Sequence, residues 1–150
     1  MSDSGAPVRN VICMKWGSKY GPEYVNRLYA MVRRHLTGDF RMVCLTDDSH
    51  GIRAEVACFP IPALELPPGI PERGWTKLAT FSADLHGLRG TALFLDLDVV
   101  IVGPLDGFFT QPGEFVIIHD YKRPWRITGN SSVYRYKLGA HPDVLEYFRT

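Results

Sequence analysis

Short apolar runs alternate with segments of helical hydrophobic spacing in the first half of the chain. The pattern predicts strands over 8–14, 40–45 and 56–59 and a helix between the first two. In that helix Pro22 suits the first turn and Gly38 marks the end. A strand–helix–strand unit this short favours parallel pairing of its two strands through a right-handed crossover.

The second half of the chain carries the same signals with longer interruptions. Residues 60–74 hold five prolines and two glycines and are predicted to form a loop. Residues 75–88 have apolar side chains along one face of a predicted helix. The other expected elements are strands over 91–102, 115–118 and 132–136, a polar loop over 119–129 and a helix over 142–148.

This alternation predicts an α/β sandwich around a mainly parallel sheet. The expected organisation is a single domain over residues 1–150, with a flexible N-terminus at 1–7. In such sheets, ligands gather beyond the carboxyl ends of the strands. Polar residues follow three predicted strands, at 15–20, at 46–48 and at Asp96 with Asp98.

The acidic pair is the strongest chemical signal in the sequence. Asp96 and Asp98 interrupt the apolar run 91–102 at positions i and i+2. On an extended backbone, side chains two apart point to the same side, so the two carboxylates are expected to converge. Converging carboxylates beside a core need a positive partner, and Mn²⁺ or Mg²⁺ suits their oxygen ligands. The pair is therefore predicted to bind a divalent cation.

Composition and charge narrow the function classes. Seventeen basic and sixteen acidic residues leave a net charge of +1, which gives no reason to expect nucleic-acid binding. No apolar stretch approaches the ~18 residues of a membrane span, and the N-terminus does not read as a signal peptide. The cytoplasm is the expected location, with the membrane periphery as an alternative. Three cysteines without a CxxC pair are expected to be buried free thiols.

Several common catalytic motifs are missing from the sequence. It contains no GxGxxG after the first predicted strand, no P-loop, no GxSxG and no HExxH. These absences argue against a dinucleotide-binding enzyme, a P-loop NTPase, an α/β-hydrolase and a zinc protease of the HExxH type.

The segment Phe94–Asp106 resembles the DxD region of GT-A glycosyltransferases, which use nucleoside-diphosphate sugars. It is most similar to the group that contains glycogenin and bacterial lipopolysaccharide galactosyltransferases. Two flanking pieces support the resemblance. Lys77 stands where that group commonly carries a basic residue before the DxD strand, and 130–133 is similar to its Asn-Ser/Ala-Gly-Val segment, with Ser132 in place of glycine. The resemblance implies a Rossmann-like GT-A fold, possible truncation at the C-terminus, and transfer of a sugar to a hydroxyl acceptor.

The resemblance also implies roles for particular residues. Asp96 and Asp98 would hold Mn²⁺ or Mg²⁺, Lys77 would face the donor sugar or diphosphate, and Asn130 would face the sugar. The donor is expected to be a UDP-sugar, and the acceptor a saccharide, a lipid-linked sugar or a protein. The implied catalytic residues are Asp96, Asp98, Lys77 and Asn130, and the implied nucleotide-sugar contacts add Lys15, Trp16, Gly17, Tyr20, Asp47 and Leu97.

Two other functions stay open on the same residues. The first is a nucleotide-sugar-binding domain without turnover, since members of the similar group continue beyond this point and supply a late metal-binding histidine. His119 and His141 are the candidate substitutes for that histidine. The second is a haloacid-dehalogenase-like phosphatase, whose DxDx[TV] motif matches residues 96–100.

Two surface features carry further expectations. Apolar residues on the last predicted helix, Val144, Leu145 and Phe148, are expected to be exposed. The expected consequence is either self-association through the C-terminal region or a marginally stable monomer. The segment 121–126 mixes basic and aromatic residues. It suits a solvated loop, a flap over the acceptor or a contact with an anionic surface.

Overall fold

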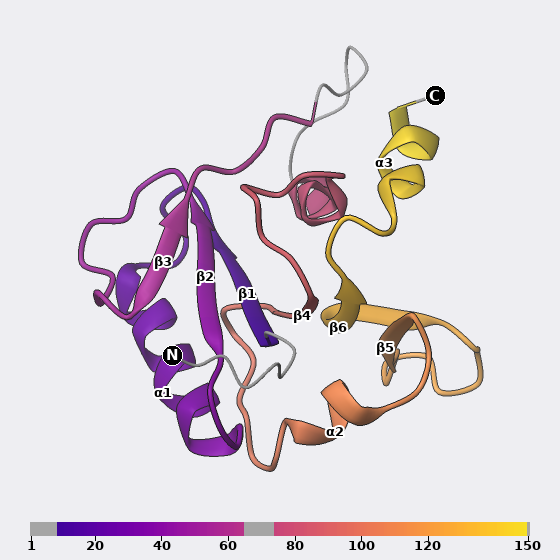
Figure 1. Ribbon diagram of the computed structural model, residues 1–150. Helices are drawn as coiled ribbons and strands as arrows, with labels where there is room; N and C mark the ends of the chain where they lie inside the picture. The colour runs from indigo at the N-terminus through magenta and orange to yellow at the C-terminus, as the bar shows by residue number, and fades with distance from the viewer. Residues whose placement is uncertain (1–8, 65–73, 150) are drawn as a thin grey trace.

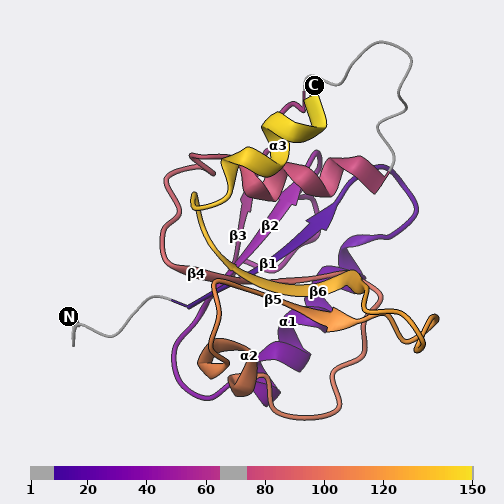
Figure 2. The ribbon, with the colours of Figure 1, turned by 90° about the vertical axis from the view of Figure 1, so that its right-hand side faces the viewer.

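A six-stranded mixed sheet forms the centre of the protein (Figures 1 and 2). The structure is a computed structural model that describes residues 9–64 and 74–149. The strands lie in the order β3–β2–β1–β4–β6–β5 across the sheet. In chain order the elements are β1 (Arg9–Lys15), α1 (Pro22–His35), β2 (Arg41–Thr46), β3 (Val56–Phe59), the 3₁₀ helix η1 (Gly74–Phe81), β4 (Thr91–Leu95), α2 (Asp106–Thr110), β5 (Phe115–His119), β6 (Gly129–Lys137) and α3 (Pro142–Arg149).

The first four strands are parallel, as the short strand–helix–strand unit predicts. β6 pairs antiparallel with both β4 and β5, so the sheet becomes mixed toward that edge. The predicted α/β class with a mostly parallel sheet is thereby confirmed. Helix α2 has no counterpart among the predicted elements. The N-terminal segment 1–7 and most of the proline-rich loop lie outside the described residues.

Two hydrophobic cores lie on opposite faces of the sheet, because successive side chains of a strand point to opposite sides. On β1, Val11 and Cys13 face α1, whereas Ile12 faces η1 and α3. Figure 2 shows α1 and α2 on one side and α3 on the other. Both cores are needed, since a parallel sheet must be covered on both faces.

Helix α1 follows the sequence closely. Pro22 occupies its first turn, and Val25, Leu28 and Val32 are fully buried against the sheet. After the helix the backbone becomes extended, and Gly38 takes a φ of 81°, which favours glycine. The expected helix and its end are both confirmed.

A row of three thiols crosses the sheet under α1. Cys13 on β1 lies in register with Cys44 on β2, and Cys44 lies in register with Cys58 on β3. All three are free, and the first two are fully buried as expected, whereas Cys58 is partly exposed. A hydrogen bond with Cys44 raises the pKa of the Cys13 thiol well above its usual value, and burial raises that pKa further.

The strand predicted over 91–102 is wrong in its second half. β4 ends at Leu95, and the chain turns through the acidic pair without resuming a strand. Val100 and Val102 are 77% and 89% exposed, so the apolar continuation is not a buried strand. A strand inside this sheet is buried on both faces, and ionised carboxylates do not tolerate burial without partners. The acidic residues therefore end the strand instead of interrupting it.

The helix predicted over 75–88 is wrong in type and length. The 3₁₀ helix η1 covers Gly74–Phe81, and turns follow it. The hydroxyls of Thr80 and Ser82 each hydrogen-bond a carbonyl three residues earlier, at 2.9 and 2.8 Å. Such side-chain bonds compete with the α-helical pattern, and Gly87 then takes a φ of 73°, which ends the helical path.

The exposed stripe predicted on the last helix is wrong for the two side chains described there. Leu145 is buried, and Val144 packs against the same core beside η1. The side chain of Phe148 lies outside the described residues, and self-association through this region stays a prediction. Within residues 9–64 and 74–149, no helix has the length and hydropathy to cross a membrane.

Two glycines of similar backbone conformation, one after β6 and one before β4, test how closely the backbone packs after β6. Gly139 and Gly87 have φ values of 76° and 73°, but a Cβ at Gly139 would lie 2.8 Å from the backbone oxygen of Ala83, whereas one at Gly87 would meet nothing within 4 Å. Gly87→Ala is expected to cost about 1–2 kcal/mol of unfolding free energy from the left-handed conformation alone. Gly139→Ala should cost at least ~1 kcal/mol more because the backbone must shift. Urea unfolding of both variants measures the difference, and equal losses would contradict the close approach.

Candidate functional site

A cavity of about 510 Å³ opens at the carboxyl ends of β1 and β4. Its walls come from three places: residues 14–20, residues 96–98, and the side chains of Lys77 and Phe94. The cavity thus brings together all the predicted site residues except Asp47 and Asn130. This edge of the sheet is where open α/β proteins usually bind ligands.

The acidic pair lies in a turn after β4 and not, as predicted, within a continuous strand. The turn after β4 is fixed by a 2.9 Å hydrogen bond from the Asp96 backbone NH to the Ser132 carbonyl. Leu97 is buried in the core beneath α1 and also lines the cavity, as do the residues on either side of it. Asp96 and Asp98 therefore share one side of the chain because Leu97 anchors the turn, although the strand itself has ended.

Lys77 is held tightly at the cavity wall. Its Nζ lies 2.8 Å from the Asp96 carboxylate and donates to the carbonyl and hydroxyl of Ser131 at 3.1 and 3.2 Å. The ammonium also lies 5.2 Å from the ring centroid of Phe94. Because each of these partners attracts a cation, the lysine is positioned before any ligand arrives.

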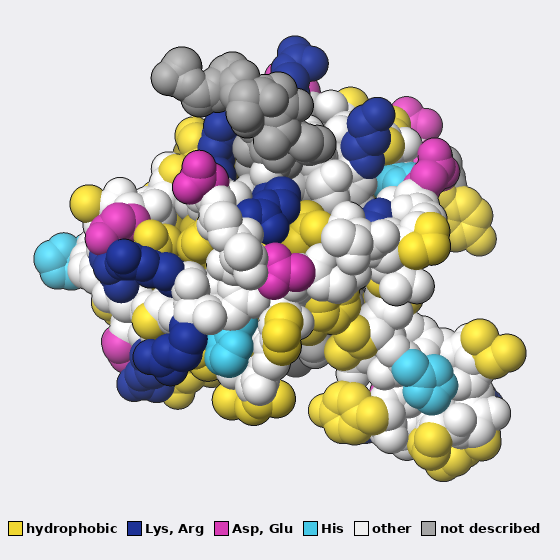
Figure 3. Space-filling model, turned by 60° about the horizontal axis from the view of Figure 1, so that its bottom comes forward, with side chains coloured by type: hydrophobic (Ala, Val, Ile, Leu, Met, Phe, Trp, Pro, Cys, Tyr) yellow, Lys and Arg dark blue, Asp and Glu magenta, His cyan; other side chains and the backbone are white. Residues whose placement is uncertain are grey.

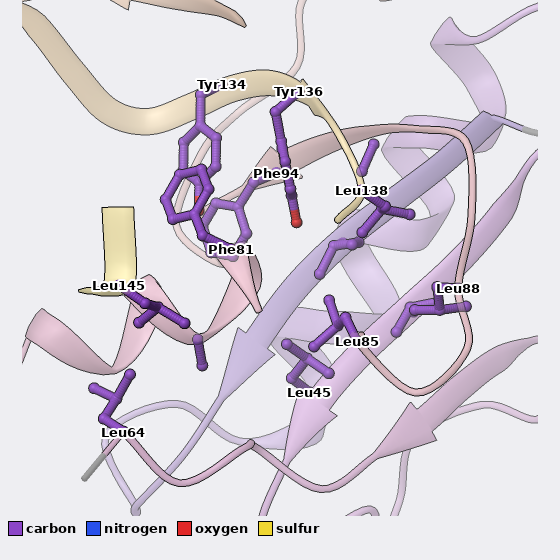
Figure 4. Close-up of a cluster of buried hydrophobic side chains, with 14 residues drawn as sticks. Leu45, Leu64, Phe81, Leu85, Leu88, Phe94, Tyr134, Tyr136, Leu138 and Leu145 are labelled. Atoms are coloured by element: carbon purple, nitrogen blue, oxygen red, sulfur yellow. The ribbon is translucent and has the colours of Figure 1, made fainter. Parts of the chain in front are cut away.

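The hydrogen-bonded core behind η1 supports that lysine. Thr80 donates its hydroxyl proton to the Lys77 carbonyl, so in the 2.8 Å contact with Tyr134 the phenol is the donor. Tyr136 donates to the Thr80 carbonyl, also at 2.8 Å. Burial raises the pKa of Tyr134 well above its usual value, in the direction that favours the protonated phenol which this bond requires. Figure 4 shows both tyrosines among Phe81 and Phe94.

Asp98 lies on the open side of the cavity. It is exposed, and its Oδ2 accepts a 3.3 Å hydrogen bond from the Tyr20 hydroxyl. The Tyr20 ring packs edge-on against Tyr24 of α1, with centroids 4.7 Å apart. The ammonium of Lys19 lies 5.3 Å from the centre of the same ring. The loop after β1 therefore meets the acidic turn across the cavity.

The floor of the site joins β1 to β2. Lys15 is only 5% exposed, and its Nζ donates a hydrogen bond to the Asp48 carbonyl at 3.5 Å. The backbone NH of Gly17, which has a φ of 69°, donates to Asp47 Oδ2 at 3.2 Å. Asp47 lines two smaller cavities of about 340 and 200 Å³, and Trp16 lines the larger of these as well as the main cavity. The predicted polar loops thus form a row of hollows along this edge.

The segment 130–133 contributes a different residue from the one expected. Asn130 uses its side-chain oxygen to accept from the Ser132 backbone NH at 2.9 Å and is not among the residues that line the cavity. Its neighbour Ser131 contacts Lys77 instead.

Neither candidate histidine lines the cavity: His119 hydrogen-bonds the Arg126 carbonyl at 2.7 Å, and His141 packs edge-on against Phe115.

Sequence reasoning did not single out several contributors to the cavity. Ser18 and Lys19 fall inside the predicted loop 15–20, so the strand end already pointed to them. Phe94 reads in the sequence as an ordinary core residue, and only the structure places its ring under Lys77. Ser131 does not line the cavity and belongs to the matched segment 130–133, but its contact with Lys77 depends on how β6 lies against the end of β4.

The donor set suits a hard divalent cation that arrives with a phosphate ligand. Asp96 and Asp98 offer carboxylate oxygens, the ligands that Mn²⁺ and Mg²⁺ prefer. In the part of the chain that the structure describes, no group of three or more His, Cys, Asp or Glu is placed to hold a metal ion. Mg²⁺ commonly uses one or two carboxylates and completes its shell with water and substrate phosphates. Three lysines, Lys15, Lys19 and Lys77, are among the residues that line the cavity, and their positive charge suits such an anion.

Comparison of the sequence with known protein families and with curated proteins found no significant match. The residues and their arrangement are therefore the basis of the function proposed below. The arrangement comprises an acidic turn, a lysine paired with one of its carboxylates, and a polar loop facing the other carboxylate.

Proposed function

We propose that this protein is a metal-dependent glycosyltransferase of the GT-A type that moves a sugar from a nucleoside-diphosphate donor to a hydroxyl acceptor. The observation that carries the proposal is the 2.8 Å pair between Lys77 and Asp96 beside the exposed Asp98, in one cavity at the carboxyl edge of the sheet. The cavity volume of about 510 Å³ lies within the range of small-molecule sites.

The acidic and basic side chains of the cavity have different proposed roles. Asp96 and Asp98 would hold the Mn²⁺ or Mg²⁺ ion. A bound divalent cation supplies positive charge where the departing diphosphate becomes more negative. Lys77 adds a fixed positive charge, and because Asp96 and Ser131 already orient it, that charge costs little reorganisation during the reaction.

The transfer itself needs positioning more than covalent catalysis. The bond between the anomeric carbon and the phosphate oxygen breaks, and its electron pair stays on the diphosphate. A new bond forms from the acceptor oxygen to the anomeric carbon, and the proton of the acceptor hydroxyl passes to the departing diphosphate or to solvent water. Holding the two reactants in one cavity supplies much of the rate increase, because it replaces a bimolecular encounter.

The loops at 15–20 and 46–48 are assigned to the nucleotide. Lys15 and the hollows around Asp47 lie next to the main cavity, so the diphosphate and the nucleoside can lie side by side along the sheet edge. Trp16 is 47% exposed and lines both the main cavity and the larger hollow beside Asp47, which suits a ring that stacks on a base or ribose. A uridine nucleotide is the proposed donor, on the resemblance to the glycogenin group.

A panel of nucleoside diphosphates with Mn²⁺ tests the donor class. At a concentration 100 times its dissociation constant, a ligand stabilises the fold by about 2.7 kcal/mol, which raises Tm by about 5–10 °C in a chain of this size. Uridine diphosphate is expected to give the largest rise, and to give it only with the metal present. Stabilisation by guanosine or cytidine diphosphate without uridine diphosphate would overturn the base preference, and no stabilisation by any of them would overturn the donor class.

Turnover separates the transferase from the two other functions. Slow release of uridine diphosphate from a UDP-sugar in the presence of Mn²⁺ is expected even without an acceptor, because water can take the acceptor's place. Donor binding without release would favour a binding domain. Hydrolysis of p-nitrophenyl phosphate that depends on Asp96 would favour the phosphatase.

A further inference from the structure

The connection between β5 and β6 carries an unusual surface. We call residues 120–128 the tip segment; it extends beyond the sheet at the right of Figure 2, in orange. Tyr121, Trp125 and Ile127 in this segment are 69%, 76% and 103% exposed. In Figure 3 the hairpin forms the lobe that projects at the lower right, and several hydrophobic side chains stand around its rim.

The tip segment has a defined backbone. The NH of Asp120 donates to the Thr128 carbonyl at 2.8 Å and closes the hairpin. Two successive turns follow, with the NH of Arg123 donating to the Asp120 carbonyl at 3.1 Å and the NH of Arg126 to the Arg123 carbonyl at 3.0 Å. The His119 ring, at the end of β5, hydrogen-bonds the Arg126 carbonyl. The backbone bonds are made within the hairpin, so the apolar side chains are displayed on a formed structure.

The same segment is positively charged. Lys122, Arg123 and Arg126 are exposed, and none of them takes part in an ion pair with the described residues. The acidic residue of the segment, Asp120, accepts the backbone NH of Lys122 at 3.1 Å. Three cations therefore belong to the same exposed segment as two aromatic rings and an isoleucine.

The geometry points to the anionic surface of a lipid bilayer as the partner of the tip segment. Trp and Tyr favour the boundary between headgroups and hydrocarbon, and basic side chains are attracted to anionic lipids. Ile127 decides between partners. A fully exposed aliphatic side chain gains free energy by entering hydrocarbon, whereas a polysaccharide or a nucleic acid would leave it in water.

This surface lies beside the candidate site. β6 begins immediately after the tip segment, and Ser131, its third residue, contacts Lys77 at the cavity wall. A membrane bound by the tip would therefore be near the cavity, which suits an acceptor carried on a lipid. The membrane contact does not depend on the proposed function, because vesicle binding requires neither nucleotide nor metal.

Vesicle sedimentation tests the contact with the whole 150-residue chain. Binding is expected to vesicles of phosphatidylcholine with phosphatidylglycerol and to be at least ~10-fold weaker to phosphatidylcholine alone. The double variant Lys122→Glu/Arg123→Glu should bind anionic vesicles at least ~10-fold more weakly. The matched control is Arg33→Glu/Arg34→Glu, which makes the same change of net charge at two exposed positions of α1 and should bind like the wild type.

Insertion is measured separately from attraction. Ile127→Ser keeps every charge and should weaken binding at least ~5-fold, since only the aliphatic contact is lost. Lipids brominated in the acyl chains should quench tryptophan fluorescence, and Trp125→Phe should remove most of that quenching. Failure to bind anionic vesicles, loss of binding in both charge-reversal variants alike, or quenching that persists without Trp125 would each overturn the proposal. Tighter binding to heparin or to RNA than to vesicles would also overturn it.

Discussion

Changing Asp98 to alanine is expected to weaken metal-dependent binding of uridine diphosphate at least ~10-fold, about 1.4 kcal/mol. The rate of sugar release from the donor should fall by about 10²–10³-fold, as when other preorganised charge-stabilising groups are removed. Asp98 is exposed and outside the core, so the side chain can be removed without a packing cost. Calorimetry with and without Mn²⁺ measures the affinity, and a nucleotide-release assay measures the rate.

Two further variants identify the cause of such a loss. Asp98→Asn keeps the shape and one carbonyl oxygen but removes the charge, so it should fall between wild type and alanine. Glu55→Gln removes an exposed carboxylate that is paired with Arg53 and does not line the cavity, and it should leave affinity unchanged. Equal nucleotide affinity in wild type and Asp98→Ala would remove Asp98 from the metal site.

Changing Tyr134 to alanine is expected to cost about 3–5 kcal/mol of unfolding free energy, as large-to-small changes of buried aromatic residues do. In a chain of this size, that lowers Tm by about 6–20 °C. Tyr134 is 2% exposed, and its ring stacks on Phe94 and Phe81 with centroids 5.0 and 5.6 Å apart. Chemical denaturation followed by circular dichroism measures the loss.

Tyr134→Phe separates the ring from its hydroxyl. It keeps the stack and removes the hydrogen bond to Thr80, so it should cost about 1–3 kcal/mol because a buried acceptor loses its donor. Tyr121→Ala, at a ring that is 69% exposed, should change stability by no more than about 0.5 kcal/mol. Equal losses in the Tyr134→Ala and Tyr121→Ala variants would contradict the assignment of Tyr134 to the core.

The fold was predictable wherever the hydrophobic period was unambiguous. The strand at 56–59 and the start of α1 at Pro22 match the structure. A short continuous apolar run favours a buried strand, and a proline is favoured in the first turn of a helix. The period does not distinguish an α-helix from a 3₁₀ helix, and it does not reveal the side-chain hydrogen bonds of the two hydroxyls that shorten η1. The end of β4 was missed because apolar residues on both sides of the acidic pair suggested continuity.

The candidate site was predictable to the extent that it lies at strand ends. Asp96, Asp98 and the loop 15–20 follow β4 and β1, so strand boundaries locate them before any tertiary structure is known. Asn130 and Ser131 depend on the start of β6, where a one-residue difference changes which side chain reaches Lys77. Contacts set by strand register between distant segments cannot be read from the local pattern.

The thiol row gives the sheet three internal reporters of its own opening. A thiol reagent reaches a buried side chain only when the backbone around it separates, so each labelling rate reports the opening that frees that cysteine. Cys58 lies on the edge strand β3 and is partly exposed, whereas Cys13 lies on β1 between β2 and β4. Labelling should therefore proceed from the edge strand inward. If the labelling rate of Cys13 equals the global unfolding rate, the β1–β4 pair beneath the acidic turn is the last part of the sheet to separate.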